Sequence, residues 1–161
     1  DAFDQAKQLL NAPNIIQAIQ KLMADNKKAK KEIEEFNKER ANNFAKEALN
    51  QVENRNGVNI ISAVNQFAPD LLKQAAYDIR NQKEQLLVVF GTTNGEKPNI
   101  VVALSDDLAA QGLNAGQMVR EGAKLIQGGG GGQPTLATAG GKSCAGINDA
   151  IQKIIEIATN R

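Results

Sequence analysis

The chain has 161 residues, enough for one moderate domain or for a small domain with an appendage. Hydrophobic residues make up 42% of it and aromatic residues 4%, with no tryptophan, so we expect an aliphatic core. Its 19 basic and 18 acidic residues give a net charge of +1. A nucleic acid or membrane partner can therefore be recognised only from local patches.

Cysteine and histidine usage excludes several kinds of site. Cys144 is the single cysteine and there is no histidine, which removes an internal disulfide framework, the usual zinc ligands, and Ser-His or Cys-His catalysis. We interpret Cys144 as an ordinary small residue near a packing surface, with a redox-sensitive thiol as the alternative.

The sequence contains no apolar run long enough to span a membrane and no start that resembles a signal peptide. We therefore expect a cytoplasmic protein without a membrane partner. The chain begins at Asp1, without Met, in a segment that already has a helical pattern. It is expected to be a piece of a longer polypeptide.

Residues 1–53 predict a helical arm with coiled-coil character. Neither Gly nor Pro occurs from Asn14 to about Val52, and Pro13 suits the first turn of a helix. Such a helix is about 58 Å long at 1.5 Å per residue, too long to be covered by one small domain. Lysines from Lys27 to Lys31 and the glutamates after them form opposite-charge pairs at helical spacing. We interpret this run as a solvated helix face, with an RNA phosphate contact as the alternative.

The apolar residues of the arm recur at heptad spacing and form what we call the seam. The candidate oligomerisation residues on it are Ile19, Leu22, Ile33 and Phe36. Beyond Phe36 the apolar stripe shifts to residues 41–52, which is typical of a change of packing partner. We expect the seam to meet another helix, either Asp4 to Leu10 or one from a second chain, and the later stripe to meet the globular region.

Residues 54–161 predict one globular α/β domain of the α+β type, in which a mixed sheet packs against helices. A turn signal at 54–57 ends the arm. Strands are expected at 58–64, 85–90, 100–104 and 135–139, and the second and third of these form a hairpin. Helices are expected to begin near Pro69, Ser105 and Asn114, and a terminal helix is expected over 148–158.

A run of five glycines follows the predicted helix that starts at Asn114. Packing alone does not readily explain it, because glycine costs about 0.5 to 1 kcal/mol relative to alanine inside a helix or strand. Two interpretations stay open. The run is either a flexible loop or a backbone surface that receives phosphate or ribose with the help of neighbouring basic residues.

Motifs for catalysis do not fit. Gly141-Lys142-Ser143 ends like a P-loop, but that motif needs a glycine where this chain has Leu136. A dinucleotide-binding motif fails as well, because the glycine run follows a helix and not a strand. Asp106 and Asp107 have no third ligand at a suitable spacing, and we interpret them as a helix cap. No catalytic residue and no metal site is predicted.

Four segments occur in an order that carries a family resemblance. They are residues 101–108, Ala115-Gly116, the glycine run with Gln133-Pro134, and the Ala-Thr-Ala-Gly-Gly segment at 137–141. Together they resemble the C-terminal domain (C-Ala) of bacterial alanyl-tRNA synthetases, a domain type also attached to phosphodiesterases and exonucleases of the DHH superfamily. The resemblance covers nearly the whole chain.

The resemblance implies a non-catalytic module of an ATP-dependent alanine-tRNA ligase. This module would bind the outer corner of tRNA(Ala), support aminoacylation and editing with the upstream catalytic and editing domains of the same polypeptide, and contribute to oligomerisation as a homodimer. It implies no cofactor in this fragment, whereas the parent enzyme would use ATP, magnesium and zinc. The alternatives are a purely structural dimerisation module and the nucleic-acid-binding domain of a DHH-family phosphodiesterase or exonuclease, against which the long arm argues.

The candidate RNA-binding residues combine the glycine backbone with nearby bases. They are Gly128, Gly129, Gly130, Gly131, Gly132, Arg120, Lys124 and Lys142, with Arg80 and Lys83 as a second group. The glycines would allow close backbone approach, and the bases would pair with phosphates.

Overall fold

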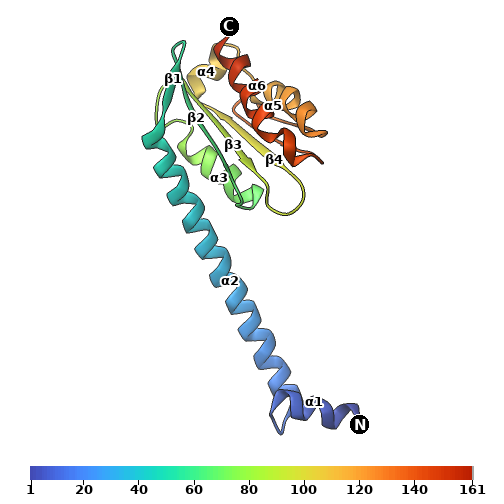
Figure 1. Cartoon of the computed structure of the whole chain (residues 1–161). Coiled ribbons are helices and arrows are strands. Elements are labelled where there is room, and N and C mark those ends of the chain that lie inside the picture. Colours follow the sequence, from blue (N-terminus) through green and yellow to red (C-terminus); the bar gives the residue numbers. More distant parts are fainter. Residues whose placement is uncertain (161) are drawn as a thin grey trace. The chain divides into compact units, whose positions relative to one another are not determined.

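The structure is a computed structural model that describes residues 1–160. It has the mixed α/β fold class expected, with a six-stranded sheet and helices in the order shown in Figure 1. Two compact units divide inside one helix, the first being Asp1–Glu39 and the second starting at Arg40. The separation of residues 1–53 from 54–161 as independent domains stays a prediction.

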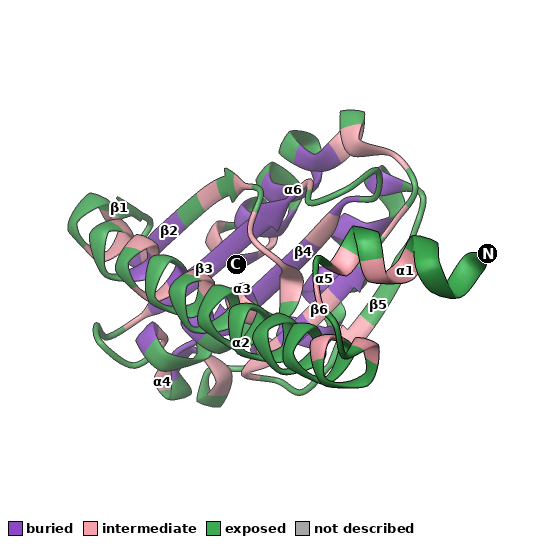
Figure 2. Ribbon diagram, turned by 90° about the horizontal axis from the view of Figure 1, so that it is seen from below, coloured by how far each residue is buried: buried purple, intermediate pink, exposed green. Residues whose placement is uncertain are grey.

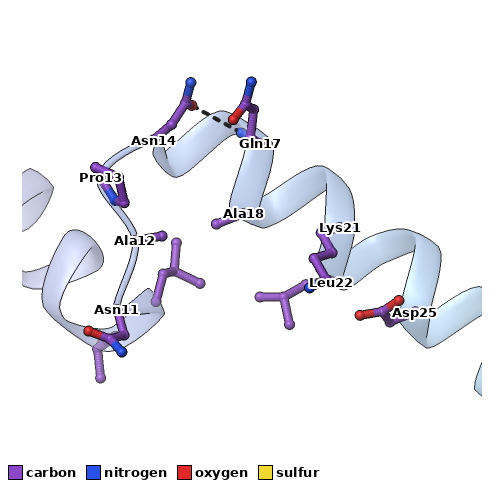
Figure 3. Close-up of a pocket in the computed structure, with 11 residues that line it drawn as sticks. Asn11, Ala12, Pro13, Asn14, Gln17, Ala18, Lys21, Leu22 and Asp25 are labelled. Carbon is purple, nitrogen blue, oxygen red and sulfur yellow. Dashed lines mark hydrogen bonds between the residues drawn. The ribbon is translucent and has the colours of Figure 1, made fainter.

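The first unit contains α1 (Ala2–Leu10) and the start of α2 (Ile15–Ala48). The Asp1 carboxylate caps α1 by accepting from the N–H of Asp4 at 2.9 Å. The side chain of Asn14 caps α2 by accepting from the N–H of Gln17 at 3.1 Å, which is drawn in Figure 3. The corner between the two helices encloses a hollow of about 550 Å³.

The seam on α2 is largely exposed. Exposed fractions are 54% for Leu22, 58% for Ile33 and 61% for Phe36, and α1 itself has no buried residue. Asp4 to Leu10 therefore does not cover the seam. Figure 2 shows the same exposure along α1 and the first turns of α2.

The last part of α2 belongs to the second unit and packs into its core. Ala41 and Ala45 are buried, and the Phe44 ring centroid lies 5.3 Å from that of Phe90. The shift of the apolar stripe after Phe36 thus marks the change of packing partner that it predicted. The helix ends at Ala48 and is followed by the 3₁₀ turn η1 (Leu49–Gln51).

The sheet has the strand order β1-β2-β3-β4-β6-β5. Its strands are β1 (Glu53–Arg55), β2 (Val58–Asn65), β3 (Leu86–Thr92), β4 (Asn99–Leu104), β5 (Gly129–Gly132) and β6 (Leu136–Gly140). β2 and β3 are parallel and joined through α3 (Pro69–Ile79), and every other neighbouring pair is antiparallel. The predicted β3–β4 hairpin is confirmed.

Alternate strand residues face opposite layers of helices. Leu87 and Val89 lie in the cluster under α5 (Ala115–Ala123) and α6 (Ile147–Thr159). Leu86 and Val88 lie in the cluster under α3 and the end of α2. The central strands are consequently buried on both faces, as Figure 2 shows in purple.

Short elements complete the fold, namely α4 (Asp106–Ala110), η2 (Lys124–Ile126) and η3 (Cys144–Gly146).

The turn signal at 54–57 does more than end the arm. Glu53–Arg55 is a strand that pairs with β2, and Asn56 and Gly57 form the hairpin turn with φ of 52° and 84°. Two consecutive residues with positive φ are what a tight two-residue hairpin needs. The prediction of a simple turn missed β1 because the strand is short, polar and fully exposed.

Candidate RNA interface

Four of the five glycines form β5 (Gly129–Gly132), one of the two edge strands of the sheet, so the interpretation of the run as a flexible loop is wrong. β5 pairs with β6, and Gly130 lies opposite Ala139. Packing explains the glycines at positions 128, 130 and 132, whereas a Cβ at Gly129 would meet nothing within 4 Å. A Cβ at Gly128 would lie 1.9 Å from the carbonyl oxygen of Gly140, and a Cβ at Gly130 would lie 2.3 Å from that of Thr138. Both distances are far below van der Waals contact, so these positions cannot carry a side chain without moving β6.

The outer edge of β5 has backbone groups that point away from β6. The N–H of Gln133 donates to the carbonyl oxygen of Leu136 at 2.9 Å, which makes these two residues a hydrogen-bonded pair. Hydrogen-bonded and non-hydrogen-bonded pairs alternate along an antiparallel ladder. Gly130 and Gly132 therefore direct their N–H and C=O groups outward, away from β6.

Arg120 of α5 lies against this edge. Its Nε donates to the outward carbonyl of Gly130 at 3.4 Å. Its Nη2 lies 3.3 Å from where a Cβ of Gly131 would be, so glycine at that position leaves room for the guanidinium. A Cβ at Gly116, near the start of α5, would lie 2.8 Å from the carbonyl oxygen of Gly132. Gly116 thus allows α5 to approach the glycine edge closely.

The two other bases of the first group lie at the beginning of the glycine run. Lys124 is exposed and forms an ion pair with Glu121, with Nζ at 3.0 Å from one carboxylate oxygen. Lys142 is also exposed, and its N–H donates to the carbonyl of Ile126 at 2.8 Å. The structure therefore brings Arg120, Lys124 and Lys142 close to β5, at the same edge of the sheet.

The second group lies at the other end of β4. Arg80 donates to the carbonyl of Leu104, the last residue of β4, whereas Asn99, the first residue, pairs with Gly140. These ends are separated by about 17 Å, because an antiparallel strand rises about 3.4 Å per residue. Lys83 is exposed in the connection that follows α3. The structure does not bring Arg80 and Lys83 together with the glycine edge.

Arg80 is committed to a structural contact. Its side chain is 11% exposed, and its Nη1 lies 2.5 Å from Oδ1 of Asp106. The hydrogen bond to Asp106 raises the pKa of Arg80, and the same bond lowers the pKa of Asp106. Asn81 also donates to the Asp106 carboxylate, at 3.1 Å. A phosphate contact by Arg80 would compete with these partners.

Asp107 also has a structural role. It lies in the first turn of α4, and its Oδ2 accepts from the N–H of Gln85 at 2.8 Å. Burial acts to raise the pKa of Asp107, but hydrogen bonds from Ser105, Gln85 and Leu108 outweigh it and leave the pKa below its usual value. Both aspartates lie at the start of α4, as their interpretation as a helix cap expects, but the cap residue itself is Ser105. The bond to Gln85 links α4 to the segment just before β3, which local sequence did not reveal.

Two further observations concern metal ions and membranes. Among residues 1–160, no group of three or more acidic, histidine or cysteine side chains is arranged to hold a metal ion. None of the helices described for these residues is both long and apolar enough to cross a membrane.

Comparison with known proteins agrees with this architecture. Residues 56–160 match the DHHA1 domain, and the chain belongs to that family. Over 160 residues it is 41% identical to an alanine-tRNA ligase of Bacteroides fragilis. The aligned region covers 98% of this chain and 18% of that relative. It is 39% identical over 145 residues to the alanine-tRNA ligase of Cytophaga hutchinsonii, covering 89% of this chain and 16% of the relative. The chain thus spans less than a fifth of the curated relatives it matches.

Solved structures give the same result. The C-Ala domain of the Aquifex aeolicus alanyl-tRNA synthetase superposes with a TM-score of 0.63 and 26% identity, covering 68% of this chain and 98% of that domain. The resemblance to this C-terminal domain is confirmed. A DHH-domain protein described as a member of the s1p family of ribosomal proteins superposes with a TM-score of 0.52 and 15% identity. The match covers 76% of this chain and 31% of that protein's chain, and it shows a shared fold alone.

Proposed function

We propose that this chain is the non-catalytic C-terminal module of an alanine-tRNA ligase and that it binds the outer corner of tRNA(Ala). The observation that supports this most is the outward backbone of Gly130 and Gly132 beside the exposed Arg120. Side-chain-free backbone allows a phosphate or a 2′-hydroxyl to approach closely, and Arg120 supplies a donor for phosphate. Lys124 and Lys142 extend this surface.

The charge of the chain suits an auxiliary contact. A net charge of +1 does not provide the dense positive field of a stand-alone nucleic-acid binder. A patch that makes about four phosphate contacts would lose roughly 10² in affinity over a fourfold rise in salt. We propose that the rest of the ligase supplies most of the affinity and that this module positions the tRNA for aminoacylation and editing.

The remaining chemistry is assigned to other parts of the ligase. Catalysis and editing, with the ATP, magnesium and zinc that they use, would belong to the upstream domains, and this module would bind no cofactor. The relatives are alanine-tRNA ligases, and we propose a cytoplasmic location because translation takes place there.

Binding of tRNA(Ala) to the 161-residue chain tests the proposal. Charge reversal by Arg120→Glu or Lys124→Glu is expected to weaken binding, and so is disruption of the folded tRNA corner. Lys73→Glu is the matched control, because Lys73 is exposed on α3, on the opposite face of the sheet. Equal binding by Arg120→Glu, Lys124→Glu and the wild type would show that the glycine edge is not the RNA surface.

A contribution to oligomerisation is a second proposed role. It is supported by the exposure of the seam, because Ile19, Leu22, Ile33 and Phe36 repeat at heptad spacing and are each more than 40% exposed. Sedimentation over a range of concentrations tests this. A strictly monomeric chain at high concentration would argue against it.

A further inference from the structure

A shallow pocket lies beside the start of β5, where three segments of the chain converge. Its volume is about 300 Å³, and its lining includes Lys97, Lys142, Asn99, Gln127, Gly128 and Gly140. None of the described residues that line it is acidic. Lys97 lies in the β3–β4 connection, 45 positions from Lys142 in the sequence, and it was not among the residues that the sequence pattern indicated.

Two contacts hold the Lys97 segment beside the Lys142 segment. The N–H of Gly141 donates to the carbonyl of Pro98 at 3.1 Å, and the Cys144 thiol donates to the carbonyl of Glu96 at 3.4 Å. Each contact lies within two residues of both lysines. The backbone that carries both side chains is therefore fixed on both sides of the pocket.

Glycine keeps the pocket floor at the level of the backbone. A Cβ at Gly141 would lie 2.2 Å from the carbonyl oxygen of Ile126, and a Cβ at Gly128 would lie 1.9 Å from that of Gly140. Side chains at these positions would collide with the neighbouring segment. The three segments can pack this closely only because these residues are glycines.

The charges of the pocket are uncompensated. Within residues 1–160, neither Lys97 nor Lys142 takes part in an ion pair, in contrast to Lys124, which pairs with Glu121. Asn99 and Gln127 add amide groups, which can donate hydrogen bonds to an anion. Two ammonium groups at one small hollow form a site for a compact anion that carries more than one acceptor oxygen.

We propose that this pocket binds one phosphate of the RNA backbone between Lys97 and Lys142. The assignment rests on the proposed function, and it extends the RNA surface from Arg120 along β5 and past Gly128. It also gives Lys97 a binding role and gives Cys144 the role of holding the Lys97 segment in place.

The salt dependence of tRNA(Ala) binding tests the pocket. The double variant Lys97→Ala/Lys142→Ala is expected to bind tRNA more weakly. The slope of the log association constant against log salt is negative, and its magnitude is expected to fall by about 1 for each lysine that contacts a phosphate. The control double variant Lys73→Ala/Lys153→Ala removes the same charge from exposed positions on α3 and α6 and is expected to keep the wild-type slope. A slope in the pocket variant that equals that of this control would overturn the proposal.

Titration with inorganic phosphate separates this proposal from the proposed function. Backbone amide signals of Gly128 and of residues 140–142 are expected to shift in the NMR spectrum of the wild type and to stay in place in the Lys97→Ala/Lys142→Ala variant. Phosphate-induced shifts without tRNA binding would keep the anion site and overturn the RNA function. Binding of tRNA with unchanged slope and no phosphate-induced shifts would keep the RNA function and overturn the pocket.

Discussion

The Arg80 guanidinium and the Asp106 carboxylate form an ion pair, with Nη1 2.5 Å from Oδ1, that joins the end of α3 to the start of α4. Arg80 also donates to the carbonyl of Leu104, at the end of β4. One side chain therefore connects two helices and the central sheet. Because the pKa of Asp106 is lowered in the folded state, this connection makes stability depend on pH.

The Asp106→Asn substitution is expected to destabilise the protein at neutral pH and to do so less in acid. A carboxyl whose folded pKa lies below its unfolded value of about 3.9 contributes fully above that value and loses its contribution as pH falls through the folded pKa. Urea unfolding at pH 7 and near pH 3 measures the effect. Glu156→Gln, exposed on α6, is the control. A deficit of Asp106→Asn that stays constant across this range would contradict the assignment.

Alanine substitutions in β5 are expected to alternate in effect. Gly130→Ala would push a Cβ into the backbone of β6 and should cost about 1 to 3 kcal/mol, the range typical of overpacking. Gly129→Ala meets open space and should change stability by no more than about 0.5 kcal/mol, as surface substitutions do. Chemical unfolding of both variants gives the comparison. Similar losses at the two positions would mean that β5 does not pair with β6 as described.

Polar substitutions on the seam are expected to abolish self-association. Ile33→Glu/Phe36→Glu replaces two exposed apolar residues with like charges, which a helix–helix interface does not accommodate. Sedimentation velocity should show association that rises with concentration for the wild type and a monomer for this variant. Lys31→Glu lies off the seam and should behave as the wild type does. If the double variant associates as the wild type does, another surface joins the chains.

Two truncations test where the globular unit begins. A chain that starts at Arg40 keeps Phe44 and Ala45, which pack in the cluster that contains Phe90. A chain that starts at Asn54 loses this cover, and its free energy of unfolding should fall by more than about 3 kcal/mol, the scale of removing a packed aromatic side chain. Thermal and urea unfolding of both chains gives the comparison. Equal stability would place the boundary at residues 53 and 54, where the sequence pattern put it.

The central elements could be predicted because the pattern of their apolar side chains indicates which faces are buried. β3 and β4 have consecutive apolar residues, which is what burial on both faces requires. Residues 148–158 repeat isoleucine at helical spacing, and the helix α6 is found there. In both cases the local pattern and the tertiary environment agree.

The two edge strands could not be predicted, because backbone pairing defines them. β1 is a polar, exposed triplet, and β5 has no side chains at all. Pairing with β2 and β6 makes each of them a strand, and a local pattern carries no information on such partners. The residues of the candidate site also fall into two groups, those that the local sequence indicates and those that only tertiary contacts bring together. The sequence indicates Arg120, which lies ten residues before Gly130, but it does not indicate Lys97, which lies beside Lys142 only because of the contacts of Pro98 and Glu96.

The all-glycine edge has a consequence for aggregation. An open strand edge usually offers its backbone to a strand of another molecule, and side chains that interlock across the new pair stabilise the product. β5 has four residues and no side chains for such interlocking, and Arg120 already occupies the outward carbonyl of Gly130. A neighbouring polypeptide strand would therefore gain little from adding here. The edge can stay exposed to solvent without acting as a template for fibril growth.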